Sequence, residues 1–183
     1  MKIAIINSNL ASGGKTGYIA GELESLFGAG GHEAVVFHAG DLSLPACDGR
    51  LCYKDENAIA LTERLAGMDA IVLVSPIYNF DLNAAAKNLI ELTGNSWKGK
   101  AVALVCTAGG DRSYLSPLGF MNSLSLDYRC LLSPRFVFAI RSDFREDNTL
   151  AEDSPVRTRL AHLAQELPIL AEAARRIRTL SES

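Results

Sequence analysis

The sequence has no apolar run close to the roughly 20 residues that a bilayer-spanning helix needs. It also has no excess of positive charge, because 18 lysines and arginines stand against 21 aspartates and glutamates, for a net charge of -3. The first absence argues against a membrane protein, and the second against a nucleic-acid-binding surface. The first residues are one lysine and strand-like residues rather than an export signal, so we expect a cytoplasmic protein.

Histidine and cysteine are also scarce, with three and four residues respectively. The histidines are scattered, and the spacing shows neither a Ser-His-Asp arrangement nor a set of metal ligands. We therefore expect no metal and no side chain that acts as a catalytic acid, base or nucleophile. In the cytoplasm the four cysteines are expected to be mostly reduced.

Hydrophobic residues make up 48% of the 183 residues, which is enough for one core, and we predict a single domain over residues 1–183. Short apolar segments predict five strands at residues 2–6, 33–38, 70–74, 101–106 and 135–140. Helical spacing predicts helices at residues 16–28, 55–67, 81–93, 114–128 and, as a long amphipathic C-terminal helix, 155–180. Strands that alternate with helices predict an α/β protein with a parallel sheet between two helical layers. Five such strands fit a flavodoxin-like three-layer sandwich of strand order 2-1-3-4-5.

Proline interrupts one of these predicted helices. Pro168 lies inside the segment 155–180 and should kink or split it, because proline lacks the N–H group that an inner helical turn requires.

Three predicted strands are followed by loops of small and polar residues, at 7–16, 75–79 and 107–111, here called the first, second and third loops. Each leads towards a predicted helix. Because loops of this kind gather at the carboxyl ends of parallel strands, where ligands bind, the three are expected to form one site.

The first loop is suited to a phosphate group. Ser8, Ser12 and Thr16 offer hydroxyls, and Gly13 and Gly14 allow the backbone to approach an anion closely. The following helix adds free N–H groups and the positive end of its dipole. A plain glycine-rich turn is an equally good interpretation of this loop taken alone.

A nucleoside-triphosphate loop is an alternative for the same residues, since Gly14-Lys15-Thr16 is typical of one. That motif needs a glycine five residues before its second glycine, and Asn9 stands there. No apolar strand ends in the aspartate that would hold Mg²⁺. This alternative predicts ATP binding and no yellow colour.

The other two loops are suited to a flat polar ring. Pro76 fixes its own backbone, Tyr78 offers an aromatic face, and Asn79 offers both donor and acceptor groups. A strand-to-helix turn with Asn79 or Asp81 as N-cap is compatible with that role. The third loop offers small residues and backbone N–H groups, whereas its Asp111 and the following Arg112 fit a ring contact or an exposed turn equally well.

Taken together, these loops resemble those of the NAD(P)H-dependent FMN reductase family. The likeness covers residues 1–140 and rests on the serine-bearing first loop, Pro76-Ile77-Tyr78-Asn79 with Lys87-Asn88, and the Gly-Gly third loop. The resemblance implies that the FMN phosphate is surrounded by Ser8, Ser12, Gly14, Lys15 and Thr16. It implies that the isoalloxazine is bordered by Pro76, Ile77, Tyr78 and Asn79, and that its polar edge is contacted by Thr107, Ala108, Gly109 and Gly110. Many members have an arginine where Leu10 and Ala11 stand here, so Lys15 is expected to supply the cation.

The resemblance also implies an activity and partners. FMN would take hydride from NADPH or NADH and reduce a small-molecule acceptor such as a flavin or a quinone. The rival interpretation is a non-enzymatic flavodoxin-like electron carrier, which is disfavoured because such carriers tend to be strongly acidic. The family implies a homodimer or homotetramer, with contacts from the apolar face of helix 81–93 or from the C-terminal helix.

Cys47 and Cys52 lie in a segment that is similar to the cysteine-bearing segment of iron–sulfur flavoproteins. Those proteins usually carry four cysteines for one cluster, so the presence of only two argues against a cluster. A Cys47–Cys52 redox pair is a further hypothesis, and Cys106 and Cys130 are expected to be core thiols.

Overall fold

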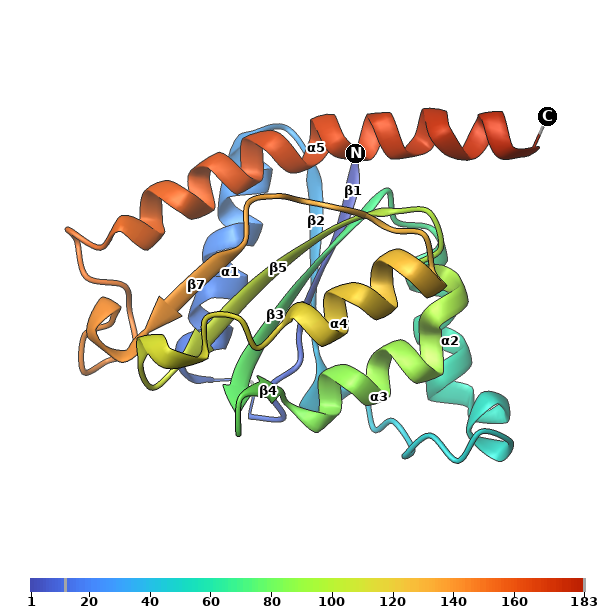
Figure 1. The fold of residues 1–183 in the computed structure, drawn as a ribbon, viewed down its shortest axis with the longest axis horizontal. Coiled ribbons are helices and arrows are strands. Elements are labelled where there is room, and N and C mark those ends of the chain that lie inside the picture. The colour runs from blue at the N-terminus through green and yellow to red at the C-terminus, as the bar shows by residue number, and fades with distance from the viewer. Residues whose placement is uncertain (12, 183) are drawn as a thin grey trace.

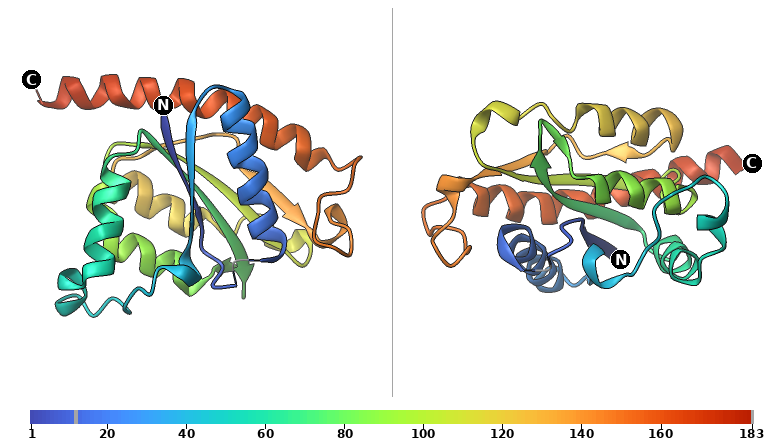
Figure 2. Two further views of the ribbon diagram at one scale, coloured as in Figure 1. Left: turned by 180° about the vertical axis from the view of Figure 1, so that it is seen from behind. Right: turned by 90° about the horizontal axis from the view of Figure 1, so that it is seen from below.

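The chain folds into three layers in the computed structural model, which describes residues 1–11 and 13–182. A twisted sheet lies between two groups of helices, and the long C-terminal helix runs across one end of the molecule and beyond the sheet (Figures 1 and 2). This is the flavodoxin-like α/β arrangement that the alternating strands and helices predict.

Over the described residues the sheet has seven strands rather than the predicted five. They are β1 (Lys2–Asn7), β2 (Glu33–His38), β3 (Ala70–Tyr78), β4 (Asp81–Leu82), β5 (Ala101–Ala108), β6 (Leu131–Leu132) and β7 (Val137–Ile140). The strand path is β2-β1-β3-β5-β6, while β4 pairs with β3 and β7 pairs with β5. The parallel order is therefore the predicted one, and the extra strands come from two local events.

The first event is an additional short strand, β6, which precedes the last predicted strand, 135–140, observed as β7. β6 pairs with the start of β5 at Ala101 and Val102, and β7 pairs with its end, from Val105 to Ala108. Pro134 lies between β6 and β7 and cannot donate to a ladder, which accounts for the separation of these two strands. The second event is a hairpin, because β4 turns back antiparallel onto the end of β3.

The helices are α1 (Gly14–Ala29), α2 (Glu56–Ala66), α3 (Ala84–Thr93), α4 (Leu118–Asn122) and α5 (Pro155–Glu182). α3 begins three residues later than predicted because the hairpin uses the preceding residues. The predicted helix 114–128 is represented by α4 and a π-helical turn, Ser123–Asp127. Pro168 does not split α5, which is continuous over 28 residues. The packing of Leu163, Leu167 and Ala171 into the core on both sides of Pro168 offsets its missing hydrogen bond.

Strand alternation divides the core between the two faces of the sheet. Side chains of neighbouring residues on a strand point to opposite faces, so Ile3 and Ile5 pack with α1 and α5, whereas Ala4 and Ile6 pack with α2, α3 and α4. Leu89 and Ile90 of α3 belong to this second core. The apolar face of α3 is thus used inside the chain, and the expected subunit contact there is wrong.

Within the described residues, none of the helices is both long enough and apolar enough to cross a membrane.

Candidate active site

One buried side chain joins the first and second loops. Asn83 is the N-cap of α3, where its Oδ1 accepts the backbone N–H of Ala86 at 3.2 Å. The same oxygen accepts the Ser8 hydroxyl at 2.8 Å and the Ser75 hydroxyl at 3.2 Å, and Asn83 Nδ2 donates to the Ser8 carbonyl at 2.7 Å. The N-cap of α3 is therefore Asn83 and neither Asn79 nor Asp81, and this amide fixes the relative position of two loops that are distant in sequence.

The first loop leads to an open helix N-terminus. Among the described residues, no side chain caps α1 at its N-cap Gly13, and the first turn holds no acidic side chain. Gly14 has a φ of +80°, a conformation that glycine adopts readily, and a Cβ at either glycine would meet no atom within 4 Å. This arrangement fits an anion, since the N–H groups of the first turn have the positive end of the helix dipole and free space before them.

The side chains of the first loop divide into buried and exposed groups. Ser8 and Thr16 are buried, and the Thr16 hydroxyl accepts Asn9 Nδ2 at 3.3 Å. Lys15 is partly exposed, with its Nζ 5.3 Å from the centroid of the Phe144 ring. The expectation for Ser12 falls outside the described residues. Among the described residues of this loop, the groups available to a ligand are thus the backbone and Lys15 rather than the two buried hydroxyls.

A close backbone contact holds the start of the first loop in place. A Cβ added to Gly40 would lie 2.0 Å from the Leu10 carbonyl oxygen. Only a residue without a side chain fits there, so the turn after β2 sets the position of the loop that follows β1.

The second loop is a strained hairpin turn. Asn79 and Phe80 have φ values of +52° and +62°, which is the left-handed region at both central positions. Asparagine tolerates this conformation, but phenylalanine rarely adopts it. Tyr78 and Phe80 are exposed, with 54% and 67% of their surface accessible. The turn therefore presents two aromatic side chains at the carboxyl edge of the sheet, an arrangement typical of a binding site.

The third loop lies beside the second, because Pro76 and Thr107 are neighbours in the β3–β5 register. Between the two loops is a shallow cleft of about 430 Å³, lined by Ile77, Asn79, Phe80 and residues 108–113. A Cβ at Gly109 or Gly110 would meet nothing within 4 Å, so their backbone is open to a ligand. Below the loop, burial raises the pKa of the Cys106 thiol well above its ordinary value, so this thiol stays neutral.

A second cavity of about 590 Å³ lies near the start of β5, at the end of the sheet opposite the three loops. It is lined by Lys98, Gly99, Arg129, Leu131, Ala174, Ile177 and Arg178. None of the three loops contributes to it, so it is separate from the candidate site.

The structure thus brings together most of the residues predicted from the sequence. The cleft is lined by Ile77, Asn79, Ala108, Gly109 and Gly110, with Tyr78 exposed beside it, whereas Pro76 and Thr107 are buried beneath it. Asp111 and Arg112 also line the cleft, and both are exposed in the turn Asp111–Ser113, so the ring contact and the exposed turn both stay predictions for these two residues. The sequence analysis missed Phe80 and Asn83. An asparagine just before an alanine-rich helical segment was the available signal for Asn83.

These features define a flavodoxin-like α/β protein whose ligand site is built from three loops at the carboxyl edge of the sheet. The model of the protein family described as "NADPH-dependent FMN reductase" matches residues 1–124, so the chain belongs to that family. It is therefore an NAD(P)H-dependent reductase that uses FMN, and the electron-carrier alternative is not supported.

Individual relatives agree with this family. An NAD(P)H-dependent FAD/FMN reductase from Geobacillus thermodenitrificans (strain NG80-2) is 29% identical over 129 residues, which are 69% of each chain. Among solved structures, the flavoenzyme NAD(P)H:(acceptor) oxidoreductase (FerB) from Paracoccus denitrificans matches with a TM-score of 0.77 at 22% identity, over 94% of this chain and 98% of that chain. The NAD(P)H:quinone oxidoreductase from Methanothermobacter marburgensis matches with a TM-score of 0.61 at 14% identity, over 91% and 96%. At these identities, the structural likenesses show the fold.

Proposed function

We propose that the chain passes electrons from NAD(P)H to a planar aromatic acceptor, a free flavin or a quinone, with FMN held across the three loops. The observation that carries this proposal is the cleft between the second and third loops, which lies at the same edge of the sheet as the open N-terminus of α1. One end of the site fits an anion and the other fits a flat ring.

At the phosphate end, the chain would act mainly through its backbone. The N–H groups of the first turn of α1 would donate to phosphate oxygens, and Gly13 and Gly14 leave the approach open. Lys15 would add a positive charge from the solvent side. Ser8 and Thr16 would support the loop from below, since both are buried.

At the ring end, the chain would orient the isoalloxazine and leave one face accessible. The N–H groups of Gly109 and Gly110 are suited to the ring's carbonyl edge, and the Asn79 amide can donate or accept beside it. The chemistry that FMN supplies when bound is two-electron exchange between NAD(P)H and the acceptor. No side chain has to move a proton. The chain's part is to bind the flavin, to orient its ring and to shield it from water.

The exposed aromatic side chains support the choice of acceptor class. Tyr78, Phe80 and Tyr114 are each about half exposed or more, and a planar acceptor can stack on such faces. A charged, non-planar acceptor such as a metal oxyanion would gain nothing from them.

We also propose a homodimer that covers this edge. The exposed apolar residues here, called the apolar rim, are Tyr78, Phe80, Tyr114, Leu115 and Leu118. Apolar side chains clustered beside a polar cleft are typical of an interaction surface. Light scattering of the wild-type protein and of Leu115→Glu tests this, since the wild-type should be a dimer and the variant a monomer. A monomeric wild-type protein would refute it.

The function is tested by visible absorption after incubation with FMN and desalting. We expect retained flavin bands that bleach when NADPH or NADH is added without air. Steady-state oxidation of NAD(P)H with a quinone, with free FMN and with ferricyanide as a non-planar acceptor then tests the acceptor class. The proposal fails if flavin is not retained, or if ferricyanide alone is reduced.

A further inference from the structure

Two thiols lie in contact in a surface loop that the proposed flavin chemistry does not use. The Cys52 thiol donates to Cys47 Sγ across 3.7 Å, and both cysteines are free. A disulfide needs its sulfurs at about 2.05 Å, so the two atoms have less than 2 Å to close, which a change of side-chain rotamer can supply.

A tight turn holds the two cysteines face to face. Asp48 Oδ1 accepts the backbone N–H groups of Arg50 at 2.9 Å and of Cys52 at 3.0 Å. Gly49 has a φ of +71°, which closes the turn between them. The geometry of the loop, rather than chance proximity of flexible side chains, brings the sulfurs together.

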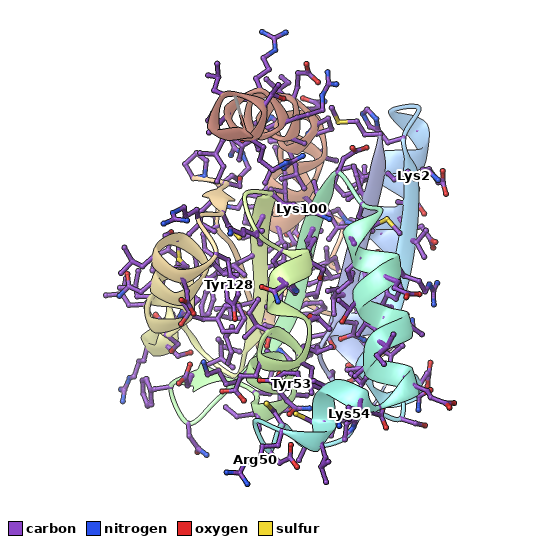
Figure 3. The ribbon with its side chains drawn as sticks, turned by 90° about the vertical axis from the view of Figure 1, so that its right-hand side faces the viewer. Lys2, Arg50, Tyr53, Lys54, Lys100 and Tyr128 are labelled. Atoms are coloured by element: carbon purple, nitrogen blue, oxygen red, sulfur yellow. The ribbon has the colours of Figure 1, made fainter. Side chains whose placement is uncertain are left out.

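The loop is also anchored to the body of the protein. The Cys47 N–H donates to Asn88 Oδ1 at 2.8 Å, and Asn88 Nδ2 donates to the Pro45 carbonyl at 2.9 Å. Cys52 packs with Ala58 of α2 and Leu92 of α3. Figure 3 shows Tyr53, Arg50 and Lys54 of this segment at one end of the molecule, far from Lys100.

The two thiols differ in exposure, which suits a reaction in which one sulfur reacts before the other. Cys47 is partly exposed, whereas Cys52 is buried, and burial together with the nearby Asp48 raises the pKa of the Cys52 thiol. The Tyr53 hydroxyl lies 3.7 Å from Cys47 Sγ. The neighbouring Cys47 raises the pKa of Tyr53 to about 12, so the phenol keeps its proton and can donate to a Cys47 thiolate.

A metal is not the better explanation for this pair. Within residues 1–11 and 13–182, no group of three or more histidine, cysteine, aspartate or glutamate side chains is placed to hold an ion. Two sulfurs alone do not complete a tetrahedral site.

We propose that Cys47 and Cys52 form a reversible dithiol–disulfide site that is oxidised by hydrogen peroxide. The Cys47 thiolate attacks the peroxide, forms an S–O bond and releases hydroxide, which gives a sulfenic acid. Cys52 sulfur then attacks Cys47 sulfur, its thiol proton leaves with the sulfenic oxygen as water, and the S–S bond forms. In sum, two thiols lose two electrons and two protons, and one peroxide becomes two waters. A reducing dithiol restores the thiols by exchange.

The first test is a peroxide titration of the native wild-type protein, followed by thiol counting and peptide mass mapping. We expect the four free thiols to fall to two, with the Cys47 and Cys52 peptides joined and the loss reversed by dithiothreitol. Cys106 and Cys130 are internal controls, since both are buried in the core and should remain thiols.

Two variants separate the roles of the sulfurs. Cys52→Ser should stop at a Cys47 sulfenic acid that a dimedone probe labels, whereas Cys47→Ser should lose no thiol at the same peroxide concentration. The proposal is overturned if wild-type Cys47 passes directly to sulfinic acid while Cys52 stays reduced, or if both thiols survive. Because the mapping of the wild-type protein needs no variant, misfolding of either variant would not decide the result.

Discussion

The Ser8 hydroxyl donates to Asn83 Oδ1 at 2.8 Å, and Asn83 Nδ2 returns a hydrogen bond to the Ser8 carbonyl at 2.7 Å. Both residues are buried. This reciprocal pair links the end of β1 to the start of α3 across 75 residues of sequence. It gives Ser8 a role as a support of the first loop, and it makes Asn83 the residue on which the spacing of the first two loops depends.

We predict that Asn83→Ala destabilises the protein by about 3 kcal/mol. The change removes the N-cap of α3, worth about 1 kcal/mol, and leaves the buried Ser8 hydroxyl without its acceptor, at about 1–3 kcal/mol. The Ser75 hydroxyl keeps its hydrogen bond to the Pro76 carbonyl at 3.2 Å. FMN affinity should fall as well, because the first two loops lose the hydrogen bonds that hold them at a fixed distance from each other. Urea unfolding and a flavin titration measure both effects. The exposed Asn95 provides the control Asn95→Ala, which should change the free energy of unfolding by less than about 0.5 kcal/mol. Equal stability of the two variants would contradict the assignment.

A second prediction concerns the contact between Gly40 and Leu10. Gly40→Ala would place a Cβ 2.0 Å from the Leu10 carbonyl oxygen. No side-chain rotation can relieve this overlap, because the backbone fixes the positions of both atoms. We expect the first loop to shift and FMN affinity to fall about tenfold, which equals about 1.4 kcal/mol.

Gly21→Ala is the matched control for this variant. Gly21 is an exposed position of α1 where a Cβ meets nothing within 4 Å. Alanine there should raise the free energy of unfolding by up to about 1 kcal/mol and leave FMN binding unchanged. If Gly40→Ala behaves like Gly21→Ala, the close contact does not position the loop.

The sequence predicts the regular parts of this molecule and misses the parts that depend on tertiary contacts. Alternating apolar strands and helices are sufficient for the layers and for the parallel strand order. The hairpin at Asn79 and Phe80 could not be predicted, because phenylalanine is unusual in a left-handed turn. The burial of Ser8 was missed for a different reason, since its partner Asn83 is distant in sequence. Family resemblance points to the loops, but only the fold shows which of their side chains face outward.

A third prediction follows from that hairpin turn. Phe80→Gly should raise the free energy of unfolding by up to about 1 kcal/mol, because the left-handed conformation costs a side-chain-bearing residue about 1–2 kcal/mol and glycine loses more entropy on folding. Little packing is lost, since 67% of Phe80 is exposed. The rate of quinone reduction should fall at the same time, because the aromatic face beside the cleft is removed.

The comparison variant for this prediction is Asn79→Gly. Asparagine accepts positive φ with less strain, so the gain in stability should be smaller than for Phe80→Gly. Thermal unfolding gives the stabilities, and steady-state kinetics give the rates. A Phe80→Gly protein that is less stable than the wild-type would show that the turn is not strained.

A fourth prediction separates the phosphate from the ring. Lys15→Ala should weaken FMN binding about threefold to fivefold, the effect of one charge that solvent can still reach, and leave riboflavin binding unchanged because riboflavin has no phosphate. The difference should shrink at high salt. Lys54→Ala, which removes an exposed lysine away from the three loops, should affect neither ligand. A matching loss for riboflavin would place Lys15 at the ring rather than at the phosphate.

The last prediction concerns a buried cation far from the site. Lys100 Nζ donates to the carbonyl oxygens of Leu65 and Ala66 at the end of α2. Figure 3 shows Lys100 in the upper part of the view, well apart from Tyr53 in the lower part. Burial, followed by the positive charge of Arg178, lowers the pKa of Lys100 from 10.5 to about 8.

This lowered pKa makes stability depend on pH in a defined direction. Below pH 8 the lysine is protonated in both the folded and the unfolded chain, and between pH 8 and pH 10.5 the unfolded chain binds more protons. Its contribution to the free energy of unfolding therefore rises with pH across that window, by up to about 3 kcal/mol. The measurement is urea unfolding of the wild-type protein and of Lys100→Met at both ends of the window. The free energy of unfolding of the wild-type protein should rise relative to that of the variant as pH rises. Lys98→Met, two residues earlier and exposed, should run parallel to the wild-type protein. A constant difference between the wild-type protein and Lys100→Met would mean that the buried lysine titrates as it does in the unfolded chain.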